Sequence, residues 1–277
     1  MSADADPGLR GEALLDALER GEVRVATRGD DGTWRVHAWV KEALLALFAS
    51  SAVEDKGLEL SAAQHARLGS ARAPFRDKAP LDVRRFSAED GVRLVPGGSA
   101  VRRGSFLGEG VVCMPPMYVN VGAWVGPGTM IDSHALVGSC AQIGARVHLS
   151  AAAQIGGVLE PPGARPVIVE DGAFVGGGCG VYEGVLVRAG AVLAAGVVLT
   201  ATSTVYDLVN ERELRGTRET PLEVPERAVV VPGSRPARGD WARERGLQQG
   251  CALLVKYRDE RTDGATALED ALRPPGR

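Results

Sequence analysis

The sequence WVGPGTMIDSHALVGSCAQIGARVHLS, residues 124–150, returns an apolar residue at every sixth position. The same spacing runs from Val95 to Val205, with one break between Ile155 and Val169. The positions on this spacing are Val95, Val101, Leu107, Cys113, Val119, Val125, Ile131, Val137, Ile143, Leu149, Ile155, Val169, Val175, Val181, Val187, Leu193, Leu199 and Val205. A period of six fits neither a helix nor simple strand alternation, and it is the signature of a parallel β-helix.

The residues four places after these positions are nearly all small, as the tight corners of such a coil require. They include Ser99, Ser105, Ala123, Thr129, Ala135, Ala141, Ala153, Ala173, Cys179 and Ala191. Three hexapeptides close one triangular coil, and its inward side chains stack on those of the next coil, about 4.8 Å away. No coil buries its inner face alone, so stability comes from neighbouring coils. We therefore predict a mainly β chain with a β-helix over residues 95–235.

The break in the spacing contains GVLEPPGARP, residues 157–166. Two adjacent prolines and a glycine cannot continue a strand ladder, so we expect a loop that leaves the prism near residues 157–167. Loops held by a rigid scaffold often carry function.

Residues 1–94 are predicted to form a mostly helical α/β domain before the repeat. Leucines at helical spacing predict a helix over residues 9–20, and an apolar run predicts another over 39–49. Between them, Asp31-Gly32 lies in an alternating segment and predicts a β-hairpin.

The remaining segments carry weaker patterns. Residues 50–80 are expected to be irregular, with a short helix over 62–68. Residues 236–277 are predicted to cap the open end of the solenoid with a strand over 251–257 and a short helix over 265–273.

The composition excludes several classes of protein. The 32 basic and 35 acidic residues give a formal net charge of −3, which does not favour nucleic acid or an anionic membrane as a partner. We expect neither a membrane span nor a signal peptide, because the sequence has no long apolar run and no basic amino-terminal region before an apolar one. The four cysteines are scattered, as in a reducing compartment, so a cytoplasmic location is expected. No HxxxH pair suggests a metal site.

Residues that the repeat does not require are the candidates for chemistry. Asp132 follows the inward Ile131 and is expected to point outward, with His134 projecting to the same side of an extended strand. Glu183 is the single acid in the segment CGVYEGVLV, and Arg93 and Arg102 flank the start of the repeat. Charged residues that point outward from a β-helix are often only solvated, so the pattern alone assigns none of them a role.

The run from MPPMYVNVG to IGGVLEP, residues 114–161, resembles bacterial tetrahydrodipicolinate N-succinyltransferases. So do WVKEALLALF, GVRLVP and CALLVKY, and within the run SCAQIG is more specific than the hexapeptide pattern. The resemblance implies a left-handed β-helix and a homotrimer with active sites between subunits. It also implies transfer of succinyl from succinyl-CoA to the amino group of 2-amino-6-oxopimelate, the ring-opened substrate, in lysine and diaminopimelate biosynthesis.

The resemblance suggests roles for individual residues. Asp132 matches the catalytic aspartate, and an amine that attacks a thioester needs such a base nearby. Arg93 matches a substrate-binding arginine, and Arg102 is a second candidate for the dicarboxylate. We expect CoA along the prism edge near the 157–167 loop. The cofactor-binding candidates there are Gly156, Gly157 and Lys256, the last of which would meet the phosphates.

The chain departs from the family pattern in GGGCGVYEG, residues 176–184. Gly180 stands where many members carry a second catalytic glutamate, and His134 stands where they carry tryptophan. His134 or Glu183 is therefore a candidate for part of that work. An acetyl-CoA-dependent enzyme acting on the same or a related amino dicarboxylate stays open, as does a non-catalytic β-helix module.

Overall fold

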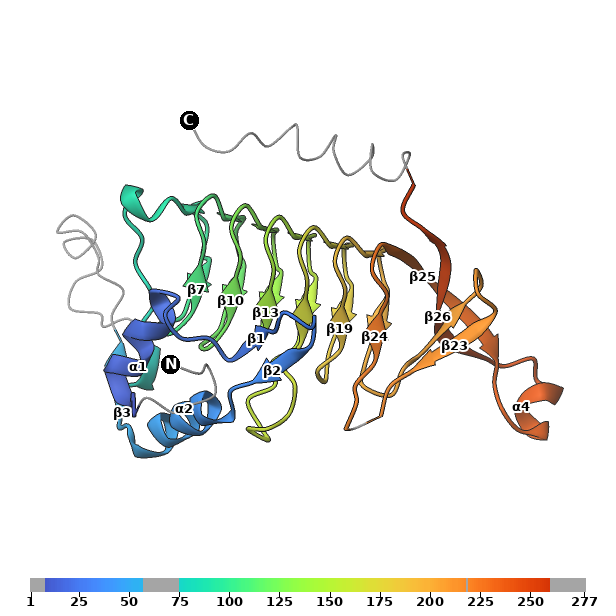
Figure 1. Ribbon diagram of the computed structural model, residues 1–277, viewed down its shortest axis with the longest axis horizontal. Coiled ribbons are helices and arrows are strands. Elements are labelled where there is room, and N and C mark those ends of the chain that lie inside the picture. Colours follow the sequence, from blue (N-terminus) through green and yellow to red (C-terminus); the bar gives the residue numbers. More distant parts are fainter. Residues whose placement is uncertain (1–7, 57–74, 218, 260–277) are drawn as a thin grey trace.

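The computed structural model describes residues 8–56, 75–217 and 219–259, and its central feature is a prism of stacked triangular coils (Figure 1). Each coil contributes one short parallel strand to each of three sheets, which we call faces A, B and C. Face A contains β5 (Arg93–Leu94), β8 (Val112–Cys113), β11 (Met130–Ile131), β14 (His148–Leu149), β17 (Phe174–Val175), β20 (Val192–Leu193) and β25 (Ala228–Pro236).

The other two faces have the same construction. Face B contains β6 (Ala100–Val101), β9 (Tyr118–Val119), β12 (Leu136–Val137), β15 (Gln154–Ile155), β18 (Gly180–Val181) and β21 (Val198–Leu199). Face C contains β7 (Phe106–Leu107), β10 (Trp124–Val125), β13 (Gln142–Ile143), β16 (Ile168–Val169), β19 (Leu186–Val187) and β24 (Glu223–Val224).

The register confirms the predicted parallel β-helix, and its short coils of three strands fit the left-handed form. Ile131 pairs with Cys113 in the coil before and Leu149 in the coil after, and all three side chains are fully buried. The small residues four places on, such as Ala135 and Ala153, are buried as well. The core is therefore one continuous column of aliphatic side chains along the prism axis.

The predicted start of the repeat at Val95 is wrong by one residue. Leu94, and not Val95, pairs with Cys113 and packs against the core. The first corner therefore holds one extra residue before Val101. Gly97 and Gly98 accommodate the extra residue with φ angles of 145° and 93°, which residues with a Cβ atom rarely adopt.

The amino-terminal segment forms α1 (Gly11–Glu19), a hairpin of β1 (Ala26–Arg28) and β2 (Trp34–Val36), and α2 (Ala38–Ser50). Both predicted helices and the Asp31-Gly32 hairpin are confirmed. The segment packs on face C and on the edge between faces B and C. Arg24 donates a hydrogen bond to Gln142 of face C at 2.8 Å, and Leu44 clusters with Cys140 of that edge.

Two further strands correct the expectation of an irregular segment over residues 50–80. β3 (Val53–Lys56) pairs antiparallel with β4 (Phe75–Lys78). The helix expected over 62–68 lies outside the described residues. A 3₁₀ turn over Ala88–Asp90 then leads into the prism.

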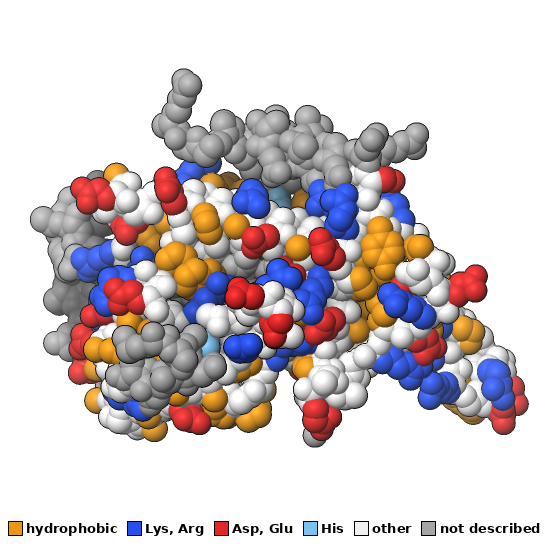
Figure 2. Space-filling model, in the orientation of Figure 1, with side chains coloured by type: hydrophobic (Ala, Val, Ile, Leu, Met, Phe, Trp, Pro, Cys, Tyr) orange, Lys and Arg blue, Asp and Glu red, His pale blue; other side chains and the backbone are white. Residues whose placement is uncertain are grey.

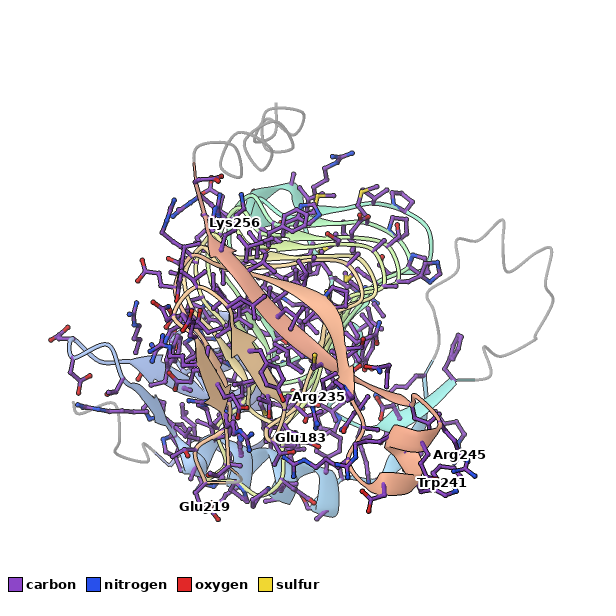
Figure 3. All side chains as sticks on the ribbon, turned by 90° about the vertical axis from the view of Figure 1, so that its right-hand side faces the viewer. Glu183, Glu219, Arg235, Trp241, Arg245 and Lys256 are labelled. Carbon is purple, nitrogen blue, oxygen red and sulfur yellow. The ribbon has the colours of Figure 1, made fainter. Side chains whose placement is uncertain are left out.

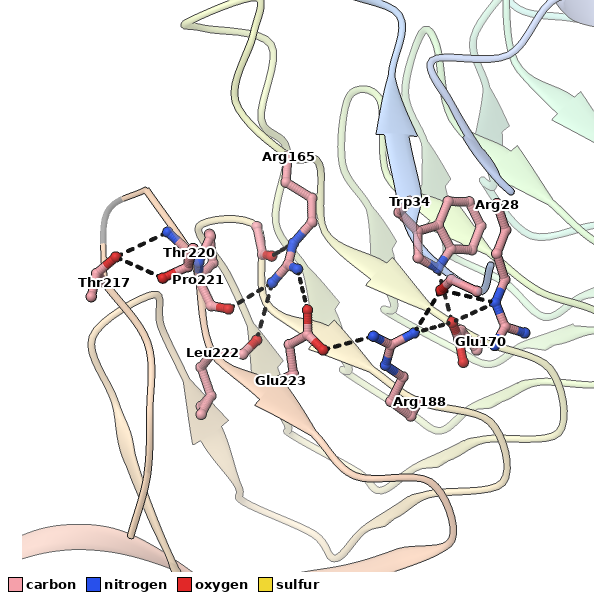
Figure 4. Close-up of polar contacts among 12 residues, drawn as sticks. Arg28, Trp34, Arg165, Glu170, Arg188, Thr217, Thr220, Pro221, Leu222 and Glu223 are labelled. Carbon is pink, nitrogen blue, oxygen red and sulfur yellow. Dashed lines mark hydrogen bonds and ion pairs between the residues drawn. The ribbon is translucent and has the colours of Figure 1, made fainter. Parts of the chain in front are cut away.

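A chain of ion pairs joins the amino-terminal hairpin to the last coils (Figure 4). The buried Glu170 carboxylate accepts hydrogen bonds from Trp34 Nε1 at 2.8 Å and from Arg188 at 3.2 Å. Arg188 also pairs with Glu223 at 2.7 Å, and Glu223 pairs in turn with Arg165 at 2.6 Å. Because Arg165 belongs to the segment between β15 and β16, the network ties three distant segments together.

The carboxy-terminal part extends face A beyond the coils, at the right of Figure 1. β25 pairs antiparallel with β26 (Gln248–Tyr257), which confirms the predicted strand over 251–257. β22 (Thr204–Asp207) and β23 (Arg212–Arg215) form a hairpin beside β26, and α4 (Asp240–Glu244) lies at the turn of the ribbon. The helix expected over 265–273 lies outside the described residues.

The surface seen in Figure 2 mixes acidic and basic side chains over the middle of the molecule, without a large area of one sign. Within the described part of the chain, no helix is long and apolar enough to cross a membrane.

Candidate functional site

Asp132 and His134 lie in one corner, on the edge between faces A and B. The prediction that both project from an extended strand is wrong, because β11 ends at Ile131 and the chain turns at once. The Asp132 carboxylate is half-buried and accepts a hydrogen bond from the Ser133 amide at 2.7 Å. His134 is exposed and has a left-handed backbone with φ of 62°.

Gln154 stabilises this corner from the next coil. Its side-chain amide donates to the carbonyl oxygens of His134 and Ala152, each at 3.2 Å. These hydrogen bonds from Gln154 fix the backbone of the corner and do not involve the side chains of Asp132 and His134.

Arg93 lies on face A two coils before Asp132. It is opposite Val112, which is opposite Met130, so the separation along the axis is roughly 10 Å. The Arg93 side chain is exposed and forms no hydrogen bond or ion pair with any residue that the structure describes. Its guanidinium is therefore available to a ligand.

Arg102 lies on the edge between faces B and C and is engaged in structural contacts. Its guanidinium pairs with Asp77 of β4, donates to Asn120 at 3.3 Å and lies over the Phe48 ring. The side chain is 16% exposed. These contacts hold the amino-terminal segment on the prism and do not support the expected role in substrate binding.

Glu183 lies on that same edge, away from Asp132. Its backbone is left-handed with φ of 54°, and its carboxylate accepts a hydrogen bond from the Ala201 amide at 3.2 Å. Within one chain, Glu183 and the Asp132 corner occupy different edges of the prism. Figure 3, which looks along the prism, places Glu183 and Lys256 on opposite sides of it.

A pocket of about 510 Å³ lies where the last coil of face B meets the β25–β26 ribbon. The lining combines hydroxyl side chains with one cation, Arg235, and one thiol, Cys251. The main residues are Val198, Thr200, Thr202, Ser203, Arg235 and Cys251. The sequence does not reveal this pocket, because the antiparallel return of β26 forms it and the six-residue spacing does not report that return.

The edge between faces A and B connects Asp132 to this pocket. Its exposed corner residues beyond Asp132 are alanine and glycine, namely Ala151, Ala152, Gly178, Ala195 and Gly196, and Gly196 itself lines the pocket. The path covers three coil steps, roughly 14 Å. An extended chain can lie along this edge without meeting a large side chain.

The residues expected to bind CoA do not line the pocket. Gly156 is buried, and Gly157 packs closely on Gly138 of the coil before. The loop that follows lies on the edge between faces B and C, where the buried Lys41 donates to Ala164 O at 2.7 Å. Lys256 is at the far end of β26 and pairs with Asp259 at 2.9 Å.

The fold and this edge define a class, the hexapeptide-repeat acyltransferases. Residues 166–201 match the model of the hexapeptide repeat of succinyl-transferases, and residues 12–49 match that of the tetrahydrodipicolinate N-succinyltransferase amino-terminal region.

Curated relatives bear a more particular name. The 2,3,4,5-tetrahydropyridine-2,6-dicarboxylate N-succinyltransferase of Bradyrhizobium diazoefficiens is 43% identical over 267 residues, covering 95% of this chain and 88% of the relative. The enzyme of that name from Polynucleobacter asymbioticus is 42% identical, covering 98% and 92%. The chain therefore belongs to the tetrahydrodipicolinate N-succinyltransferase family and is an acyltransferase.

A solved structure supports the fold alone. It is a putative 2,3,4,5-tetrahydropyridine-2-carboxylate N-succinyltransferase from Campylobacter jejuni, with a TM-score of 0.54 and 14% identity. The match covers 92% of this chain and 63% of that longer one.

Proposed function

We propose that this protein transfers the succinyl group of succinyl-CoA to the amino group of 2-amino-6-oxopimelate, the open form of tetrahydrodipicolinate, in lysine and diaminopimelate biosynthesis. The observation that carries the proposal is the A–B edge, which joins a free carboxylate at Asp132 to a pocket about three coils away. The names of the curated relatives support the same reaction.

Asp132 acts as the base in this proposal. The amine nitrogen attacks the thioester carbonyl carbon, the carbon–sulfur bond breaks, and the CoA thiol leaves. The amine must lose a proton, which the Asp132 carboxylate accepts and which then passes to the departing sulfur. Asp132 suits this role because, among the described residues, its carboxylate accepts a hydrogen bond from the neighbouring Ser133 amide through Oδ1, which leaves Oδ2 free.

Arg93 binds one carboxylate of the acceptor. It has no competing partner among the described residues, and a guanidinium binds a carboxylate through two parallel hydrogen bonds. The roughly 10 Å between its coil and that of Asp132 suits a seven-carbon dicarboxylate whose amine reaches the base.

The acyl donor occupies the pocket with its nucleotide end. Arg235 supplies a cation for phosphate, and Thr200 and Thr202 supply hydroxyl groups. The pantetheine arm then follows the alanine and glycine edge toward Asp132. This arrangement replaces the expected placement beside Gly156 and Lys256.

The assembly we propose is a homotrimer with sites between subunits. The described part of the amino-terminal segment packs on face C and on the B–C edge, and in this proposal faces A and B meet neighbouring copies. A neighbour packed along the A–B edge turns the open path into a closed cleft. No membrane or nucleic acid takes part in this proposal.

A thiol-release assay tests the function. The protein is incubated with succinyl-CoA or acetyl-CoA, with and without the amino dicarboxylate. We expect release that depends on the amine and is faster with succinyl-CoA. Faster release with acetyl-CoA favours the alternative N-acetyltransferase, and release from neither donor contradicts an acyltransferase acting on this substrate.

A further inference from the structure

The ring of Tyr182 lies across face B above two glycines. A Cβ atom at Gly180 would lie 2.4 Å from Tyr182 Cε2 and 2.9 Å from the hydroxyl oxygen. A Cβ atom at Gly156 would lie 2.7 Å from Cδ1. Carbon atoms do not approach so closely, so the ring fills the space that side chains at both positions would need. Tyr182 therefore occupies the place where a glutamate was expected.

The hydroxyl group of Tyr182 lies over Gly180 but has no hydrogen-bond partner among the described residues. The residue is half-buried, and its oxygen forms no hydrogen bond with the chain over 8–56, 75–217 and 219–259. A phenol oxygen carries one donor hydrogen that needs an acceptor. The ring thus has a structural role, while the hydroxyl stays free for a ligand.

The register places this hydroxyl between the pocket and Asp132. Gly180 pairs with Val198, which lines the pocket, and on its other side with Gln154. Gln154 pairs with Leu136, just after the Asp132 corner. Of the outward side chains along this path, Gln154 already donates to the corner carbonyls and Val198 is apolar. Among these face-B side chains, Tyr182 offers a hydroxyl donor that has no partner in the described residues, and this hydroxyl lies over Gly180, one residue from the A–B edge.

We propose that the Tyr182 hydroxyl binds the free carboxylate of the succinyl group and so selects the acyl donor. This inference rests on the proposed function. The acyl group lies at the reacting end of the arm, near Asp132, and its carboxylate is two methylenes beyond the thioester carbonyl. A hydrogen bond to a charged acceptor is stronger than one between neutral groups. A site with such a donor disfavours an acetyl group, which leaves the donor unpaired.

The test is Tyr182→Phe, which removes the hydroxyl and keeps the ring over Gly180 and Gly156. With saturating amine, kcat/KM for succinyl-CoA should fall roughly 10- to 100-fold. The value for acetyl-CoA should stay within about twofold of the wild type. The thermal midpoint should not change, because the ring still covers both glycines. Tyr206→Phe makes the same chemical change on β22 and should leave donor selectivity intact.

Three outcomes contradict the proposal. If Tyr182→Phe leaves kcat/KM unchanged with both donors, the hydroxyl does not bind the acyl group. If kcat/KM falls equally with both donors, the hydroxyl has a general role and does not select the donor. A wild type that prefers acetyl-CoA contradicts the proposal, because an acetyl group has no carboxylate to bind, and it also favours the alternative N-acetyltransferase. Absence of thiol release from the wild type instead contradicts the proposed function itself, so the two failures are distinguishable.

Discussion

His134, two residues after Asp132, has a left-handed backbone. The equivalent corner positions in later coils are Ala152, Gly178 and Gly196, two of which are glycine. Cys140 and Arg146 adopt the same conformation at corners of the other two edges, so the left-handed backbone is a property of the turn in this prism. This turn places Asp132 on the A–B edge, where the proposed reaction needs its carboxylate.

Asp132→Asn tests that role at the level of one side chain. The amide keeps the shape and can still accept the Ser133 hydrogen bond, but it cannot accept a proton from the amine. We expect kcat/KM to fall about 100-fold or more, with unchanged thermal stability and oligomeric state. Steady-state kinetics and size measurement check this, and full retained activity removes Asp132 from catalysis.

The corners between strands set how closely two neighbouring coils approach each other. At Gly138 a Cβ atom would lie 2.2 Å from the Gly157 nitrogen, which belongs to the backbone of the next coil. Unlike a flexible side chain, a backbone atom cannot move aside without opening the ladder. Glycine at such a position is therefore required by coil stacking.

Gly138→Ala should consequently lower the free energy of unfolding by about 1–3 kcal/mol. The matched control is Gly163→Ala in the loop between β15 and β16, where an added Cβ meets no atom within 4 Å. Denaturant unfolding of both variants measures the difference. Equal stability of the two contradicts the argument from coil spacing.

At the scale of the whole molecule, the Glu223 network joins the last coil to the amino-terminal hairpin and to the loop segment that carries Arg165. Burial raises the pKa of Glu223, but hydrogen bonds from Arg188 and Arg165 outweigh it and hold the pKa below its ordinary value. A carboxyl with a lowered folded-state pKa stabilises the protein above the unfolded pKa. That contribution is lost as the pH falls through the folded value.

Glu223→Gln should therefore destabilise the protein near pH 7 by about 1 kcal/mol, a modest value because the carboxylate is 42% exposed. The difference in stability between Glu223→Gln and the wild type should vanish once the pH is below both the ordinary glutamate pKa of roughly 4.3 and the lower pKa of Glu223 in the folded protein. Thermal unfolding from pH 3 to pH 8 measures it. Glu226→Gln, at an exposed glutamate of the same coil, should show no such trend.

Much of this architecture was predictable from local patterns. The six-residue spacing identified the coils, since every inward position must be apolar to stack on the next. Helical leucines and Asp31-Gly32 likewise predicted α1, α2 and the first hairpin. Asp132 stood out because it is charged at a position just after the inward Ile131, and Arg93 because the family resemblance covers it.

Only the tertiary structure decided how those residues are grouped. Glu183, Arg102 and the 157–167 loop lie on one edge of the prism, and Asp132 and His134 lie on another. In a triangular coil, the two strands that a corner connects determine the edge on which that corner lies. The tertiary structure also produced the Arg235 pocket from an antiparallel return that has no period, and it laid Tyr182 over Gly180. Local spacing determines which residues face the core, whereas contacts between distant coils and strands determine which polar groups can meet one ligand.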